Sequence, residues 1–176
     1  MYSPTVEKLI KIFAKFPTIG PKTAARFVFY LIKTPKAEIV QLVETIATLK
    51  NKTKTCSACQ RAFEPEIDTE KKCSICSSIK RQNGQICLVE KEVDLEALEK
   101  TKSYLGTYFV LGENASPLKE DEGVLESKTQ ILLQRIKDEN IKEIILALNQ
   151  TIEGQHTSLW LKRKLEATKI QVTQLG

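Results

Sequence analysis

The sequence contains no apolar run long enough to cross a membrane. Its longest apolar stretches, such as Ile144 to Leu148, fall far short of the roughly 20 residues that a spanning helix needs. The start, MYSPTVEK, also lacks the basic-then-apolar order of a signal peptide. With 41% hydrophobic and 28% charged residues, the composition is not that of a disordered, fibrous or repeat protein. We therefore expect a soluble, globular, cytoplasmic protein with no membrane partner.

Acidic residues are scarce in the first third of the chain. Residues 1–55 hold ten lysines and arginines against three acids, a net charge of +7, whereas the remaining residues sum to −2. A positive surface of this kind attracts a phosphate backbone. A solvated, lysine-rich helical surface would have the same composition, so charge alone does not separate the two interpretations.

The first 50 residues are expected to be helical. Apolar residues recur at helical spacing from Val6 to Phe16, and a second periodic set begins after Gly20-Pro21, where a turn and a helix start are both favoured. A third set follows Thr34-Pro35. These patterns predict three helices, the first two joined by a short turn.

The turn in FPTIGPKTAAR is a candidate phosphate site. In a tight turn between two helices, the backbone N–H groups of the turn and of the second helix point outward and can hold a phosphate without reading base sequence. Lys22 and Arg26 are four residues apart on that second helix, so they share a face and extend the cationic surface. The alternative is an ordinary helical hairpin whose two cations are only solvated.

Four of the five cysteines form two CxxC pairs: Cys56, Cys59, Cys73 and Cys76. The surrounding residues 51–84 are polar and short of aliphatics, so they cannot build a core without a crosslink. Four thiolates suit one structural Zn²⁺ ion in a closed tetrahedral site. A redox pair would instead predict one CxxC motif at the mouth of a βαβ fold. The fifth cysteine, Cys87, is expected in the core of a buried strand.

From Ile86 onward, short apolar runs alternate with helical stretches. Strands are expected at 86–90, 107–112, 143–148 and 170–175, and helices at 95–100, 127–140 and 157–167. This alternation predicts a mostly parallel sheet covered by helices. The capping-box pattern of Ser127 to Gln130 predicts that the second of these helices begins there.

The order of these pieces resembles the RecR family of recombination mediators over nearly the whole chain. The resemblance is carried by LIKIFAKFPTIGPKTAARFVFYLI, the four cysteines, ICLVEKEVDLEALEK and ILALNQTIEGQHTSLWL. It implies an α+β protein of three modules: a helix-hairpin-helix DNA-binding region at 1–54, a four-cysteine zinc finger at 55–84 and a Toprim α/β domain at 85–176. The C-terminal extension usual in the family is expected to be missing.

The resemblance also implies a function and its residues. Family members are non-catalytic DNA-binding mediators that act with RecO, and in some settings RecF, to help load RecA onto single strands coated by single-strand-binding protein. Binding to single- and double-stranded DNA and a dimeric or tetrameric assembly are therefore expected. The hairpin cations correspond to Lys22 and Arg26, and the zinc ligands to the four CxxC cysteines. Thr18 stands where the family usually has glycine, in a turn that favours a positive φ.

The stretch ALNQTIEGQHT departs from the Toprim enzymes. Those enzymes use a glutamate after the first strand, here Glu90, and a DxD pair whose positions hold Asn149 and Thr151 in this chain. An amide and a hydroxyl do not supply the negative charge that holds Mg²⁺ against a phosphate. The sequence therefore predicts a Toprim scaffold without its catalytic metal site. No catalytic residue is assigned.

The surviving acids, Glu90 and Glu153, are candidates for docking a basic partner. The resemblance places Glu153 where RecO contacts this domain, and the alternative is that Glu153 caps the helix that follows. His156, the only histidine, is expected to be exposed and not a ligand. Two other functions stay open: a metal-dependent Toprim nuclease or primase-type enzyme, suggested by Glu90 and Glu153, and a zinc-stapled protein-interaction module without a nucleic-acid role.

Overall fold

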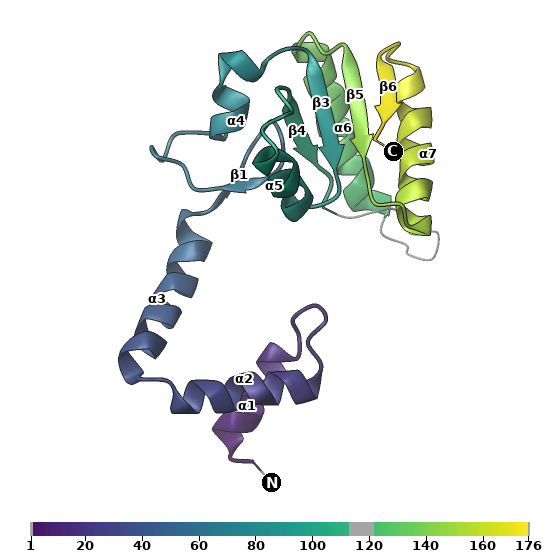
Figure 1. The fold of residues 1–176 in the computed structure, drawn as a ribbon. Helices are drawn as coiled ribbons and strands as arrows, with labels where there is room; N and C mark the ends of the chain where they lie inside the picture. Colours follow the sequence, from purple (N-terminus) through teal and green to yellow (C-terminus); the bar gives the residue numbers. More distant parts are fainter. Residues whose placement is uncertain (1, 113–121, 176) are drawn as a thin grey trace. The chain divides into compact units, whose positions relative to one another are not determined.

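The structure is a computed structural model that describes residues 2–112 and 122–175. The chain divides into two compact units, Met1–Lys52 and Thr53–Gly176 (Figure 1). Within the described ranges, no helix is both long enough and apolar enough to cross a membrane. The first unit is helical, and the second contains the sheet.

Residues 2–52 form three helices, as the apolar spacing predicts. α1 spans Pro4–Phe13, α2 spans Pro21–Lys33 and α3 spans Lys36–Lys52. A proline opens each of the first two helices. Its fixed φ suits the first helical turn, and an N–H at that position would have no acceptor within the helix, so nothing is lost by its absence. α1 packs against α2, whose buried side chains are Ala24 and Val28. α3, which is described in full, buries no side chain.

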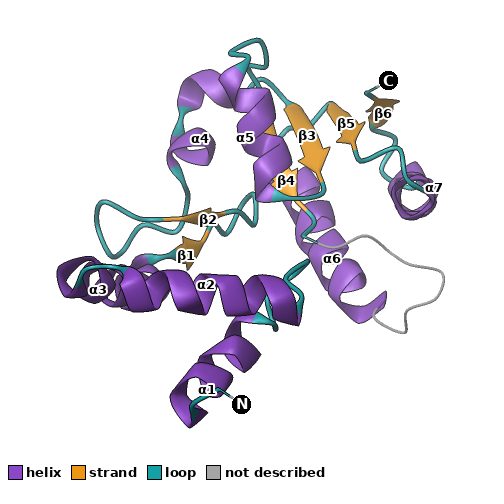
Figure 2. Ribbon diagram, turned by 60° about the horizontal axis from the view of Figure 1, so that its bottom comes forward, coloured by secondary structure: helices purple, strands orange, loops and turns teal. Residues whose placement is uncertain are grey.

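The second unit contains a parallel sheet, which confirms the prediction from the alternating pattern. β3 (Gln85–Val89), β4 (Thr107–Val110), β5 (Glu143–Ala147) and β6 (Gln171–Gln174) pair in the order β4-β3-β5-β6. α5 (Glu92–Lys100), α6 (Glu122–Asp138) and α7 (Ile152–Glu166) connect or follow these strands. α5 lies on one side of the strands and α6 on the other (Figures 1 and 2).

Each face of the sheet carries its own hydrophobic layer, because successive side chains of a strand point to opposite faces. The face under α6 and α7 has a buried core that includes Ile86, Leu88, Phe109, Leu132, Leu146 and Leu161. The face under α5 has a second core of Cys87, Val89, Leu95, Tyr108 and Val110. Cys87 is therefore a core residue, as predicted, and burial raises the pKa of its thiol to about 12.

The predicted start of α6 at Ser127 is wrong. The helix already includes Glu122, and the Ser127 hydroxyl donates to the carbonyl oxygen of Val124 at 2.8 Å inside the helix. Ser127 with Gln130 has the residue types of a capping box, but the residues before Ser127 are themselves helical, so Ser127 lies inside the helix. Residues 113–121, which precede this helix, lie outside the described residues.

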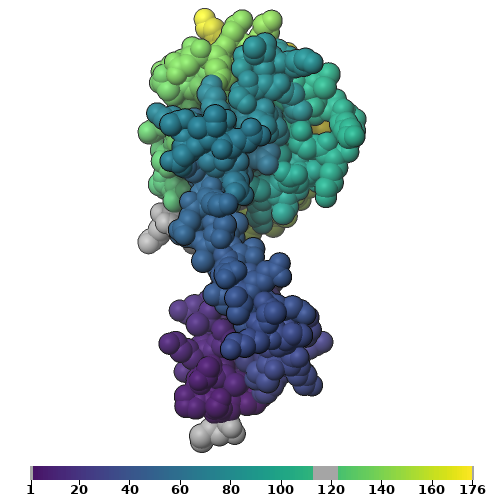
Figure 3. Space-filling model, turned by 90° about the vertical axis from the view of Figure 1, so that its left-hand side faces the viewer, coloured from purple at the N-terminus to yellow at the C-terminus, as the bar shows by residue number. Residues whose placement is uncertain are grey.

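A small module precedes the sheet in the second unit. β1 (Lys54–Thr55) and β2 (Ala62–Phe63) form an antiparallel pair, followed by α4 (Ser74–Ser77) and the short 3₁₀ helix η1 (Ile79–Arg81). Its core consists of the four CxxC cysteines and Ala58, with Phe63 and Ile75 packed against them. In the space-filling view, the atoms of this module lie directly against the rest of the second unit (Figure 3).

Candidate functional site

The turn between α1 and α2 holds a threonine in a strained conformation. Backbone N–H groups of Phe16 and Ile19 donate to carbonyl oxygens three residues earlier, at 3.0 and 3.1 Å, and so tighten the turn. Thr18 has φ of +64°, a left-handed conformation that a β-branched residue rarely adopts. Gly20 has φ of −82° and no atom within 4 Å of an added Cβ. The position that favours glycine is therefore residue 18, where this chain has threonine.

Thr18→Gly is expected to stabilise α1 and α2. Glycine removes a left-handed penalty of about 1–2 kcal/mol but adds freedom to the unfolded chain, so the net gain is about 0.5–1 kcal/mol. The measurement is the opening free energy of α2 amides from hydrogen exchange. Thr45→Gly, the same change at an exposed position inside α3, should instead destabilise its helix. A loss of protection in α2 on Thr18→Gly would show that the threonine side chain supports the turn.

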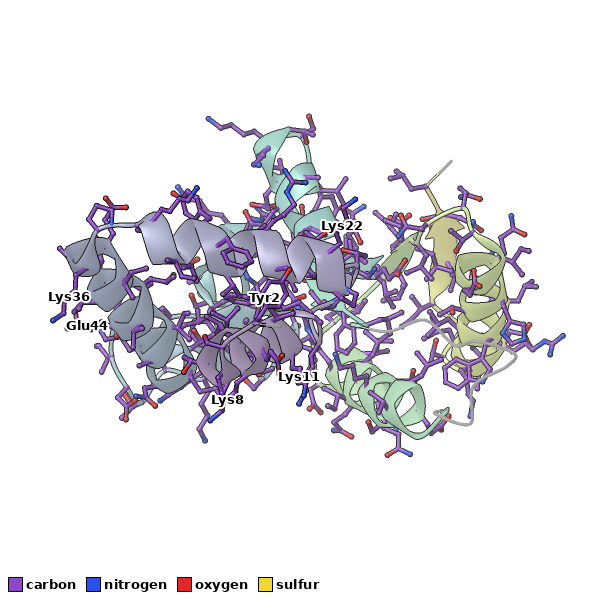
Figure 4. The ribbon with its side chains drawn as sticks, turned by 90° about the horizontal axis from the view of Figure 1, so that it is seen from below. Tyr2, Lys8, Lys11, Lys22, Lys36 and Glu44 are labelled. Carbon is purple, nitrogen blue, oxygen red and sulfur yellow. The ribbon has the colours of Figure 1, made fainter. Side chains whose placement is uncertain are left out.

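Lys22 and Arg26 lie on the first turns of α2, immediately after this connection. Both side chains are exposed, and Figure 4 shows Lys22 at the start of the helix. Among the described residues, no side chain caps the N-terminus of α2, where Gly20 is the N-cap and Pro21 the first helical residue. The first free amides of the helix and two cations therefore share one end of α2, an arrangement that suits an anion such as phosphate.

The four cysteines predicted as ligands meet in one cluster. Their Sγ atoms all lie within 4.8 Å of one another, and all four residues are buried. The Sγ atoms of Cys59 and Cys73 are 3.6 Å apart, and the Cys73 N–H donates to Cys56 Sγ at 3.3 Å. Four converging sulfur atoms with a backbone donor on one of them can hold a metal ion.

The thiols of this cluster influence one another's ionisation. Hydrogen bonds from Cys59, then Cys73 and Cys76, lower the pKa of the Cys56 thiol, whereas hydrogen bonds with Cys56, then Cys59 and Cys73, raise the pKa of Cys76. The four groups do not ionise together by themselves, because like charges at this distance repel. A cation between them removes this conflict, so the donor set fits a metal that prefers thiolates.

Two carbonyl groups of the first CxxC turn attach the module to the sheet. The Cys59 carbonyl oxygen accepts the Val110 N–H at 2.8 Å, which occupies a donor on the outer edge of β4. The Ala58 carbonyl oxygen accepts from Arg135 Nη1 at 3.2 Å. The same guanidinium also donates to the Tyr108 carbonyl and the Thr107 hydroxyl, both at 2.8 Å. The cysteine cluster is therefore connected to β4 and α6 by direct hydrogen bonds.

Arg135 is a structural residue that sequence reasoning missed. Its side chain is only 5% exposed and pairs with Glu139 at 2.8 Å, in addition to its three bonds to the module and β4. An arginine in a helix that also carries glutamates and lysines is usually solvated, and no local pattern distinguishes this one. Only the approach of the module to α6 shows its role.

The carboxyl ends of β3 and β5 bring Glu90 and Asn149 together. The two strands are adjacent and parallel, with Val89 paired to Ala147, so the residues that follow each strand meet at one edge. The Asn149 amide donates to Glu90 Oε2 at 2.5 Å, and Lys91 Nζ lies 3.4 Å from Glu90 Oε1. Both oxygens of this buried carboxylate thus have a partner from the protein, one of them a cation.

The start of α7 places the other residues of ALNQTIEGQHT. Thr151 is the N-cap of the helix, and its hydroxyl accepts the Gly154 N–H at 3.1 Å. Glu153 lies in the first turn, where its negative charge interacts favourably with the positive end of the helix dipole. The capping hydrogen bond, however, is accepted by Thr151. Glu153 and His156 are both exposed, as expected for His156.

Two protein-family models match the chain. The helix-hairpin-helix of RecR matches residues 6–50, and the Toprim domain matches residues 84–176. The first match includes α1, α2 and the connection between them. The second includes the whole described parallel sheet and the edge that holds Glu90 and Asn149.

Several curated proteins named recombination protein RecR are similar to the chain over almost its full length. That of Bifidobacterium animalis subsp. lactis is 40% identical over 175 residues, covering 99% of this chain and 84% of the relative. That of Chloroherpeton thalassium is 40% identical over 178 residues, covering 99% and 85%. That of Tropheryma whipplei is 36% identical over 176 residues, covering 100% and 86%.

Proposed function

This chain belongs to the RecR family of recombination proteins, and on that premise we propose that it is a DNA-binding mediator of recombination that does no chemistry on the DNA. The observation that carries the proposal is the exposed pair Lys22 and Arg26 beside the uncapped start of α2. Helix amides and cations hold phosphates through charge and geometry, so they bind DNA without selecting a sequence. Single- and double-stranded DNA both present such phosphates.

The absence of catalysis is proposed from the surroundings of Glu90. Its carboxylate is buried against the Asn149 amide and the Lys91 ammonium group, and the remaining Toprim position, Thr151, caps α7. A Mg²⁺ ion held for phosphoryl transfer needs several carboxylates, and a neighbouring ammonium group opposes its binding. This arrangement favours a scaffold role over a Toprim nuclease or primase-type enzyme.

One structural Zn²⁺ ion is proposed for the cysteine cluster. Cys56, Cys59, Cys73 and Cys76 would hold it, and the bound ion would supply a crosslink with no chemistry of its own. All-sulfur donors favour zinc over Mg²⁺ or Ca²⁺, which prefer oxygen. The crosslink would act on a module whose buried core is otherwise only Ala58 with two partly buried side chains.

The proposed partners are RecO and, in some settings, RecF, with RecA and single-strand-binding protein reached indirectly. Glu153 is the candidate contact with RecO, since it is exposed on the first turn of α7. Glu90 is buried and bonded to its neighbours, so we confine the docking proposal to Glu153. A dimer or tetramer is also proposed, because α3 leaves a set of large apolar side chains exposed: Val40, Leu42, Val43, Ile46 and Leu49.

The double variant Lys22→Ala/Arg26→Ala is expected to weaken DNA binding and its salt dependence together. Loss of two phosphate contacts should lower the slope of log K against log salt by about 1.8 for duplexes and about 1.4 for single strands. Affinity at low salt should fall about 10- to 100-fold. The measurement is fluorescence anisotropy of labelled DNA over a salt series with Mg²⁺ present, followed by gel analysis of the DNA, which should stay intact.

The matched control is Lys36→Ala/Lys50→Ala, which removes the same charge from exposed positions on α3. This control should keep most of the affinity, because long-range attraction is screened within about 10 Å at ordinary salt. Equal losses in the two double variants would show that net charge, and not the hairpin, binds DNA. Cleavage that needs Mg²⁺ and is abolished by Glu90→Gln would restore the enzyme hypothesis.

A further inference from the structure

A groove with an aromatic lining runs between α1 and α2. Its volume is about 830 Å³, and its aromatic side chains come from Tyr2, Phe29 and Tyr30. These three residues are 52%, 40% and 68% exposed. An exposed cluster of aromatic side chains of this kind is unusual on a protein surface and marks an interaction site. The rings of Tyr2 and Phe29 meet edge to face with centroids 5.4 Å apart. Figure 4 shows Tyr2 between the two helices.

Four cations line the same groove: Lys11, Lys22, Arg26 and Lys33. Among the described residues of its lining, Glu7 is the only acid. Positions 22, 26, 29, 30 and 33 follow the spacing of one helical face, so cations and aromatic rings share a stripe along α2. The stripe is about 16 Å long at 1.5 Å per residue, enough for a short run of nucleotides.

We propose that this groove binds single-stranded DNA by stacking unpaired bases on Tyr30, Phe29 and Tyr2 while its cations hold the phosphates. An aromatic ring can stack on any base, since every base has a π-face, but paired bases inside a duplex are not accessible to it. The groove thus gives the first unit a contact with single strands that the hairpin amides do not provide. The proposal rests on the proposed function, because it adds a base contact to a DNA-binding surface.

The charge of the groove favours a nucleic acid over a second copy of the chain. A protein partner would fit the apolar lining as well as a base does. A second copy of residues 1–55, however, would bring ten cations and three acids to a groove that already has four cations against one acid. A DNA strand brings one negative charge with each base, so it fits a groove whose lining contains both cations and aromatic rings.

The test compares two oligonucleotides with the same number of phosphates. One is an oligothymidylate, and the other replaces all of its thymidines by abasic residues, so that the phosphates stay and only the bases are lost. The full-length wild-type protein is expected to bind the oligothymidylate about 5- to 10-fold more tightly, as one or two stacked bases require. Tyr30→Ala should remove most of this ratio and leave the affinity for the abasic strand unchanged. Tyr30→Trp should restore the ratio.

Ile32→Ala is the matched control, because Ile32 is exposed on α2 but does not line the groove. It should keep the wild-type ratio. Equal wild-type binding of both strands, or a ratio unchanged in Tyr30→Ala, would overturn the groove while leaving DNA binding through Lys22 and Arg26 intact. Failure to bind either strand at low salt would overturn the proposed function itself. If Tyr30→Ala changed the number of subunits measured by sedimentation but left the ratio of the two affinities unchanged, the groove would be assigned to self-association.

Discussion

Cys73→Ser is expected to abolish metal binding by the cysteine cluster and, with it, the ordered structure of residues 54–81. The cluster supplies four sulfur atoms within 4.8 Å of one another, and the module has few other buried side chains. Structural zinc contributes about 10–16 kcal/mol of apparent binding free energy in small modules, far more than the side chains here can replace. The measurement is metal content per chain by atomic absorption, together with hydrogen exchange of the module.

The effect should extend to β4 and α6, because the module is bonded to both. Without an ordered first CxxC turn, the Cys59 carbonyl no longer accepts the Val110 N–H, and the Arg135 guanidinium loses the Ala58 carbonyl. An open strand edge and a buried cation with a missing partner both cost free energy. We therefore expect faster amide exchange in β4 and in the C-terminal half of α6. The amides of α1 and α2, in the first unit, serve as the internal reference.

Cys87→Ala is the control for this experiment. Cys87 is also buried, but it lies in the core under α5 and outside the cluster. Its replacement should cost about 1 kcal/mol or a little more and leave one metal ion per chain. If Cys73→Ser kept its metal and the wild-type exchange of β4, neither the ligand assignment nor the proposed coupling would stand.

Gly154→Ala is expected to destabilise the second unit by about 3 kcal/mol or more. A Cβ on Gly154 would lie 2.0 Å from the Asn149 carbonyl oxygen and 3.0 Å from its carbonyl carbon. Both atoms belong to the backbone, so relief requires α7 to move from the edge of the sheet. Such a shift would break the bond from the Gly154 N–H to the Thr151 hydroxyl and loosen Asn149 from Glu90.

Trp160 provides the readout for this variant. It is the only tryptophan, lies on α7 and packs against the core under that helix. Its fluorescence during unfolding in urea should show a lower midpoint for Gly154→Ala. Gly123→Ala is the matched control, because no described atom lies within 4 Å of its added Cβ in α6, and a helical alanine should gain up to about 1 kcal/mol. An unchanged midpoint for Gly154→Ala would show that α7 can shift freely.

Several features of this protein follow from short-range patterns. The spacing of two CxxC pairs predicts a metal cluster, because two short turns place four thiols at one point. Helical periodicity predicts α1 to α3, and alternating apolar runs predict the parallel strands. The resemblance to Toprim enzymes places Asn149 and Thr151 at the positions of the acid pair, and the identity of these two side chains is visible without a structure.

The start of α6 shows where a local pattern fails. Ser127 and Gln130 have the residue types of a capping box, but the residues before Ser127 continue the helix to Glu122. The residues before a capping residue can be helical or non-helical at similar free energy, so packing of the preceding turn against the core can decide where the helix begins. Leu125, buried in the core under this helix, supplies that packing.

The sequence by itself determined the order of the helical, cysteine and sheet regions, and the cysteine cluster, because each depends on patterns of residues close together in the chain. Only the tertiary structure decided the roles of Arg135, Glu90 and Tyr30. Arg135 meets Ala58 across 77 positions of the chain, Glu90 accepts a hydrogen bond from Asn149 across 59 positions, and Tyr30 shares a groove with Tyr2. Such contacts depend on how elements pack, and no local spacing encodes that.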